Sequence, residues 1–194
     1  MPTLVNSRPL FCLGDSLTLG GTGAEQTPWP QRLRLALASA RCVGNQGVSG
    51  STVADMASRF ATDIDGQGFV GGVLMGGVND IKAGTAGATV LATYETLVND
   101  MVVAGLKVLC VTTSPFGNNA DWTAGKQTQL DILNAGILAI TDPLVTVYDG
   151  YAFMGEPGTP EDLRATYDIG DGLHWTQTGI DAFYPQIQAT LAAF

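Results

Sequence analysis

The sequence contains a single histidine, His174, and three cysteines, none of them in a Cys-x-x-Cys motif. Zinc sites of the common kind need several Cys and His ligands at short spacings, so we expect no metal site. The odd number of cysteines does not suggest a disulfide framework. Cys12 and Cys110 lie inside apolar runs, which predicts buried free thiols.

Basic residues are scarce as well. Nine Lys and Arg stand against 18 Asp and Glu, and the formal net charge is −9. Such an excess of negative charge repels nucleic acid and anionic membranes, and no cluster of basic residues offsets it locally. We therefore expect no nucleic-acid partner.

Long apolar runs are also missing. No stretch of 18 apolar residues is present, so we expect no membrane insertion. The opening letters, MPTLVNSRPLFCLG, show no basic segment followed by a long apolar one, and no signal peptide is visible. Together these absences predict a protein that is cytoplasmic or otherwise soluble.

The 194 residues have the composition of a globular protein, with 45% hydrophobic and 14% charged residues. This length fits one domain, residues 1–194. Short apolar runs bounded by Gly, Pro, Asn or Asp predict five buried strands, at 9–13, 42–45, 69–75, 107–112 and 144–148.

Between the strands, apolar residues recur at helical spacing, which predicts helices within 90–102, 130–140 and 180–191. Pro30 and the apolar residues 33–38 suggest a further helix. Pro185 interrupts the last pattern, so that helix is expected to be kinked or to begin late. Strands that alternate with helices predict an α/β fold, a parallel sheet with helices on both faces.

Four polar segments follow or close the predicted strands: Gly14-Asp15-Ser16-Leu17, Asn45-Gln46-Gly47, Gly77-Val78-Asn79-Asp80 and, later, Asp171-Gly172-Leu173-His174. In a parallel sheet the carboxyl ends of all strands lie at one edge, and ligands bind there. The four segments are therefore expected to meet in space although they are far apart in the sequence.

The residue types in these segments suit acyl transfer to a serine. A serine hydroxyl becomes nucleophilic when a neighbouring base takes its proton, and His174 is the only histidine available to Ser16. Asp171 precedes His174 by three positions and can orient its imidazole. Candidate donors for an oxyanion are the backbone N–H groups of Ser16 and Gly47 and the side-chain amide of Asn79.

Structural interpretations compete with these catalytic ones. Ser16 could cap a helix, Asp171 and Asn79 could be turn residues, and a lone histidine is usually structural. The presence of all four segments favours catalysis. Asp15 and Asp80 are expected to orient loops through hydrogen bonds from backbone N–H groups, not to transfer protons.

The four segments, in this order, resemble the conserved blocks of the GDSL or SGNH hydrolase family of esterases and lipases over nearly the whole chain. The resemblance implies a flavodoxin-like three-layer α/β/α sandwich, a triad of Ser16, Asp171 and His174, oxyanion donors at Ser16, Gly47 and Asn79, and no metal or organic cofactor. Two features depart from many relatives: Trp175 and Thr176 follow the histidine, and a Gly76-Gly77 pair precedes Asn79.

The predicted activity is hydrolysis of a carboxylic ester through an acyl-serine intermediate. Short acyl groups are favoured because no lid or apolar flap is evident, and removal of an acetyl group from a sugar is one form of this activity. The predicted partner is thus a small-molecule or carbohydrate ester. The alternatives are an acyltransferase, a lysophospholipase or thioesterase with the same triad, and a non-catalytic carbohydrate-binding module.

Overall fold

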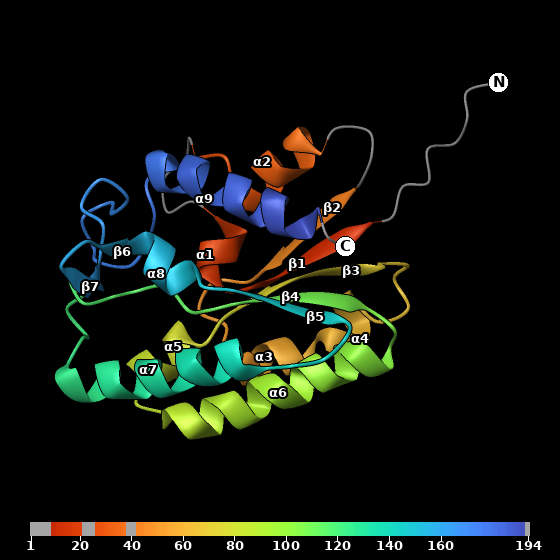
Figure 1. Ribbon diagram of the computed structural model, residues 1–194, viewed down its shortest axis with the longest axis horizontal. Coiled ribbons are helices and arrows are strands. Elements are labelled where there is room, and N and C mark those ends of the chain that lie inside the picture. Colours follow the sequence, from red (N-terminus) through yellow and green to blue (C-terminus); the bar gives the residue numbers. More distant parts are fainter. Residues whose placement is uncertain (1–8, 21–25, 38–41, 193–194) are drawn as a thin grey trace.

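The computed structural model describes residues 9–20, 26–37 and 42–192. Its centre is a five-stranded sheet in the order β2-β1-β3-β4-β5, with every neighbouring pair parallel (Figure 1). The strands are β1 (Leu10–Gly14), β2 (Val43–Gly47), β3 (Gly71–Met75), β4 (Lys107–Val111) and β5 (Val145–Tyr148). All five predicted strands are present, although β2 continues past residue 45 to Gly47. The prediction that all five are buried is wrong for the edge strands: β2 is buried only at its two ends, and every residue of β5 is partly exposed.

The central strands are buried from end to end. Every residue of β1 and β3 is buried, because each strand has a neighbour on either side and helices over both faces. A strand in this position needs apolar side chains at successive positions and not only at alternate ones. This burial on both faces explains why the sequence of each central strand is a continuous apolar run.

The carboxyl ends of the strands lie in one row. Gly14 is the register partner of Gly47 on one side and of Met75 on the other. Met75 in turn pairs with Val111, and Val111 with Tyr148. The polar segments that follow β1, β2 and β3 therefore begin at the same edge of the sheet.

Helices cover both faces of the sheet, as Figure 1 shows, and this confirms the three-layer α/β/α architecture. One layer holds α1 (Ser16–Leu19), α2 (Trp29–Ala36) and α9 (Gln177–Leu191). The other holds α3 (Val53–Ser58), α4 (Phe60–Asp63), α5 (Val78–Lys82), α6 (Gly87–Val103) and α7 (Ala124–Ala139). At the carboxyl edge lie α8 (Gly150–Met154) and a small hairpin of β6 (Gly155–Glu156) and β7 (Thr159–Leu163).

The four predicted helices are present as α2, α6, α7 and α9. The end of the α2 prediction, at residue 38, lies outside the described residues. Helix α9 continues through Pro185, so the prediction of a late start is wrong. The short helices α1, α3, α4 and α5 and the hairpin were not predicted, because elements of two to six residues leave no periodic pattern.

Cys12 and Cys110 are buried free thiols, as predicted, whereas Cys42 is exposed. Among the helices of the described ranges, none has the length and apolar character needed to cross a bilayer.

Candidate active site

Ser16 is the first residue of α1, directly after β1 and Asp15. Asp15 caps this short helix, since its Oδ1 accepts a hydrogen bond from the N–H of Leu17 at 2.9 Å. The turn is tight: a Cβ at Gly14 would lie 2.6 Å from the carbonyl oxygen of Met75. The strand end and its cap thus fix Ser16 at the carboxyl edge of the sheet, and the predicted loop-orienting role of Asp15 is confirmed.

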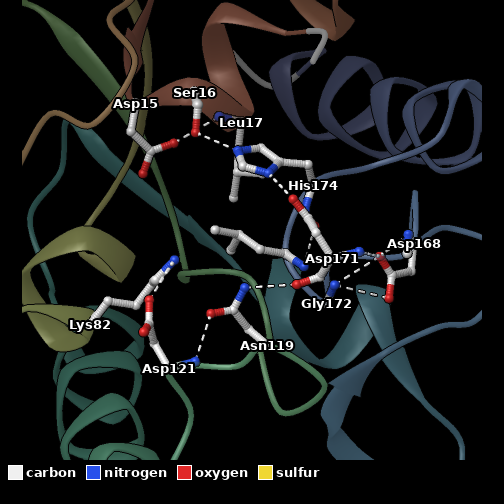
Figure 2. A network of polar contacts seen from close by, with 12 residues as sticks. Asp15, Ser16, Leu17, Lys82, Asn119, Asp121, Asp168, Asp171, Gly172 and His174 are labelled. Atoms are coloured by element: carbon white, nitrogen blue, oxygen red, sulfur yellow. Dashed lines mark hydrogen bonds and ion pairs between the residues drawn. The ribbon is translucent and has the colours of Figure 1, made fainter. Parts of the chain in front are cut away.

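His174 lies in the turn that precedes α9. The turn is closed by an isolated antiparallel bridge between Asp168 and Trp175, and the N–H of Ile169 donates to the carbonyl of His174 at 3.1 Å. The imidazole Nε2 of His174 lies 3.0 Å from the Oγ of Ser16 (Figure 2). The two side chains come from positions 158 residues apart, yet they lie within the distance that a proton transfer requires.

Asp171 holds the other side of the imidazole. Its Oδ2 lies 2.6 Å from Nδ1 of His174, while its Oδ1 accepts the backbone N–H groups of Leu173 and His174 at 2.9 and 2.8 Å. Burial raises the pKa of Asp171, but these hydrogen bonds outweigh burial and the net pKa is lowered below 3.8. The carboxylate is therefore ionised at neutral pH and keeps the Nδ1 proton on its side of the ring.

Sequence reasoning missed Asp168. Its carboxylate accepts the backbone N–H groups of Gly170, Asp171 and Gly172 at 2.7, 3.1 and 3.0 Å, as Figure 2 shows for part of the set. Through these hydrogen bonds one side chain stabilises the conformation of the whole turn. The only signal in the sequence was an aspartate close to a glycine pair, which is common in ordinary turns.

Asn79 and Asp80 lie on α5 and reach the loop that follows β2. The side-chain amide of Asn79 donates one hydrogen bond to the carbonyl of Ser51 at 3.0 Å, and its second N–H has no acceptor among the described residues. Asp80 accepts the N–H of Val53 at 3.0 Å, which confirms its predicted loop-orienting role. Helix α5 thereby fixes residues 51–53 at the edge of the sheet.

The N–H of Gly47 is already paired. It donates to Oδ1 of Asn45 at 3.0 Å, and a Cβ at Gly47 would lie 2.1 Å from the backbone nitrogen of Leu19. Gly47 therefore lets α1 approach β2 closely, which differs from the donor role predicted for it. Gly50, further along the same loop, has a positive φ of 76°, and a Cβ there would meet open space. Its N–H has no acceptor within the described ranges.

A buried acid lies behind the serine. Burial raises the pKa of Asp15 to about 6, although the hydrogen bond from Leu17 and the positive charge of His174 act in the opposite direction. Burial likewise raises the pKa of Asp80, against the opposing hydrogen bond from Val53. The site thus combines a readily ionised carboxylate at Asp171 with two carboxyl groups that resist ionisation.

A small cavity of about 10 Å³ lies beside Ser16 and His174. It is lined by Ser16, Leu17, Gly20, Gln26, His174, Trp175 and Ile180. Trp175 is a buried wall of this cavity: its indole N–H donates to Oγ of Ser114 at 3.2 Å and its ring packs on Phe183 at 4.7 Å. The side-chain oxygen of Gln26 is buried and has no hydrogen-bond donor among the described residues.

A hydroxyl, an imidazole and a carboxylate joined in this way are the arrangement found in serine hydrolases. The chain matches the model of the GDSL-like lipase/acylhydrolase family over residues 12–182, and it belongs to that family of ester hydrolases.

Solved structures agree with this assignment at the level of the fold. A lipase/acylhydrolase from Enterococcus faecalis is 23% identical, with a TM-score of 0.77 and coverage of 96% of each chain. A GDSL-like lipase from Bacteroides thetaiotaomicron is 21% identical (TM-score 0.78; 96% of this chain, 89% of the other). A carbohydrate acetylesterase family member from Sinorhizobium meliloti is 22% identical (TM-score 0.69; 95% and 99%). Among curated proteins, no sequence matches the chain.

Proposed function

We propose that this ester hydrolase removes short acyl groups, acetyl groups of sugars among them, with Ser16 as nucleophile, His174 as general base and Asp171 as the group that orients it. The observation that carries the proposal is the continuous contact from Ser16 Oγ to His174 Nε2 at 3.0 Å and from His174 Nδ1 to Asp171 Oδ2 at 2.6 Å. With the Nδ1 proton directed at Asp171, Nε2 is left as the acceptor for the serine proton.

The reaction follows from these positions. As Ser16 Oγ bonds to the ester carbonyl carbon, its proton passes to His174 Nε2 and the carbonyl oxygen gains the electron pair of the C=O bond. Collapse of this tetrahedral species breaks the bond to the alcohol, which takes the proton from Nε2. Water then attacks the acyl-serine with the same proton transfers, and the acid and free Ser16 are released.

The negative oxygen needs donors that are not already paired. The N–H of Ser16 has no acceptor within the described parts of the chain, and one side-chain N–H of Asn79 is also free there. We propose these two groups, together with the N–H of Gly50 in place of that of Gly47, as the oxyanion donors. Gly47 is unsuitable because its N–H is bound to Asn45, whereas Gly50 lies in the loop that Asn79 fixes at Ser51.

Two features of the cavity support a small acyl group and a hydroxylated substrate. Its volume is only about 10 Å³, roughly the space that one water molecule needs, so it leaves no room for a long acyl chain. The unpaired oxygen of Gln26 is an acceptor that a sugar hydroxyl can satisfy. One structural neighbour is a carbohydrate acetylesterase family member.

The first test replaces the nucleophile. We expect Ser16→Ala to lower kcat/KM for p-nitrophenyl acetate by about 10⁴-fold or more, since the proton donor and the attacking atom are lost together. The matched control is Ser58→Ala, a serine at the exposed end of α3, which should keep wild-type activity. Unchanged turnover in Ser16→Ala would refute the proposed mechanism.

Substrate size is tested with p-nitrophenyl acetate, butyrate and octanoate, and with an acetylated sugar assayed by released acetate. We expect kcat/KM to fall as the acyl chain lengthens, because longer chains exceed the cavity. A rise with chain length would contradict the short-acyl proposal and leave Ser16 as nucleophile untouched. Formation of a new ester in the presence of an added alcohol would instead identify an acyltransferase.

A further inference from the structure

Hydrogen bonds within the turn that contains Asp171 and His174 fix its shape, but they do not fix its position relative to the sheet. The carboxylate of Asp168 accepts N–H groups from within the turn, and the bridge to Trp175 closes it. Such contacts fix the shape of residues 168–175 without setting their distance from Ser16. A second set of contacts must therefore hold the turn against the sheet.

Asn119 supplies one of these contacts. It lies in the loop between β4 and α7, and its Nδ2 donates to the backbone carbonyl of Asp171 at 2.7 Å, across 52 positions of the sequence (Figure 2). Directly beside it, the backbones touch: a Cβ at Gly172 would lie 2.2 Å from the carbonyl carbon of Asn118. Gly172 has a φ of 73°, so the close approach and the backbone conformation both require glycine there.

Asn119 is itself held on every side. Its Oδ1 accepts the N–H of Asp121 at 3.1 Å, its own N–H donates to Phe116 at 2.9 Å, and its carbonyl accepts the N–H of Trp122 at 2.9 Å. Asp121 also forms an ion pair with Lys82 of α5 at 3.4 Å. The bond from Asp121 orients the amide so that Nδ2 faces Asp171, and the backbone bonds hold the loop, so the amide can act as a fixed support for Asp171.

We propose that Asn119 is a positioning residue: it anchors the Asp171 turn to the loop after β4 and so sets the distance from the imidazole of His174 to Ser16. The proposal rests on the function proposed above. It acts through the carbonyl of Asp171 and not through the substrate. Misplacement of a catalytic group by about 1 Å costs up to about 100-fold in rate, so the loss of one such anchor can matter far more than the hydrogen bond itself.

The test compares Asn119→Ala and Asn119→Asp with Asn118→Ala. Aspartate keeps the acceptor for Asp121 but, when ionised, has no N–H for Asp171. Asn118 is the matched control because it lies in the same loop and its side chain faces Asp162. The measurements are kcat and KM for p-nitrophenyl acetate. The concentration of active sites used for kcat is determined by labelling with a fluorophosphonate to completion.

We expect both Asn119 variants to lose about 10-fold in kcat with KM within about twofold of wild type, and Asn118→Ala to match wild type. Wild-type kcat per labelled site in the Asn119 variants would overturn the proposal, because any fall in total activity would then come from a smaller fraction of folded protein. A rise in KM with kcat unchanged would also overturn it, since the side chain would then act on substrate binding.

A second readout does not depend on activity. The chain has one histidine, so the imidazole N–H signal in a ¹H–¹⁵N NMR spectrum belongs to His174 alone. Because the contact from Nδ1 to Asp171 is only 2.6 Å long, we expect the signal of this proton far downfield. We expect the signal to shift or broaden in both Asn119 variants and not in Asn118→Ala. An unchanged signal would overturn the positioning role, whether or not the wild type proves to be an esterase.

Discussion

Asp15 and Asp171 are both aspartates near His174, the proposed general base, but their surroundings differ. Asp171 is 42% exposed and accepts three hydrogen bonds, two from backbone N–H groups and one from the imidazole, so its pKa is lowered. Asp15 is buried and accepts one, from Leu17, and its pKa is raised to about 6. Desolvation without enough compensating donors explains the contrast.

The raised pKa of Asp15 predicts a specific pH dependence of stability. Between its unfolded pKa of 3.8 and its folded pKa of about 6, the folded chain binds more protons at this site. The stabilisation from Asp15 is complete below the lower value and is lost as the pH rises through the upper one. We expect the free energy of unfolding of Asp15→Asn, relative to wild type, to increase by about 2 kcal/mol between pH 4 and pH 7.

Urea unfolding at each pH measures this difference. Asparagine does not titrate and still offers an oxygen to the N–H of Leu17, so the helix cap is retained. Asp65→Asn, at an exposed position, serves as the control for the loss of one negative charge. A difference between Asp15→Asn and wild type that stays constant with pH would show that burial does not raise the pKa of Asp15.

At the scale of elements, α9 shows how a helix tolerates an internal proline. Pro185 lies inside Gln177–Leu191 on the exposed side of the helix, where water can reach the carbonyl of Asp181 that loses its usual donor. The buried residues of α9, which include Phe183 and Ile187, pack on the core on either side of the proline. Burial of this face keeps the helix continuous where the local sequence favours a break.

We expect Pro185→Ala to stabilise the protein by about 1 to 2 kcal/mol in urea unfolding. Alanine restores the backbone hydrogen bond and is a better helix former. It also gives the unfolded chain more conformational freedom, which lowers stability by a smaller amount. Gln186→Ala, its neighbour on the helix, measures the ordinary effect of an alanine there. A destabilised Pro185→Ala variant would mean that the proline ring makes packing contacts that outweigh the missing bond.

At the scale of the whole molecule, one buried amide connects a helical layer to the carboxyl edge of the sheet. Asn134 of α7 accepts the N–H of Thr113 at 2.8 Å and donates to its carbonyl at 3.2 Å, just after β4 ends. The hydroxyl of Thr113 donates to the carbonyl of Gly76, in the segment that leads into α5. Helix α7 and the loops after β3 and β4 are thus connected through buried polar groups.

We expect Asn134→Ala to lower the free energy of unfolding by about 2 to 4 kcal/mol, because it leaves two buried backbone groups unpaired and opens a small void. Asn99→Ala, an exposed asparagine on α6, makes the same truncation without these consequences and should change stability by less than about 0.5 kcal/mol. Equal midpoints for the two variants in urea would contradict this account.

The sequence by itself determined the elements that depend on local pattern. Short apolar runs identified the five strands, helical spacing identified α6, α7 and α9, and Pro30 with the apolar residues after it identified α2. The rule that parallel strands end at one edge then indicated that Ser16 and His174 would meet, and the structure brings them to 3.0 Å. Periodicity and strand-end chemistry involve only neighbouring residues, which is why they can be recognised without coordinates.

The tertiary structure decided which groups are free to act and what holds them. Gly47 and Gly50 look alike in the sequence, but only the folded chain shows that Asn45 takes the N–H of one and that the other has no acceptor within the described ranges. Asn119 reaches Asp171 from a distant loop, and a contact of that kind leaves no periodic trace. Whether a donor is available depends on every neighbour packed around it, and packing is a property of the whole fold.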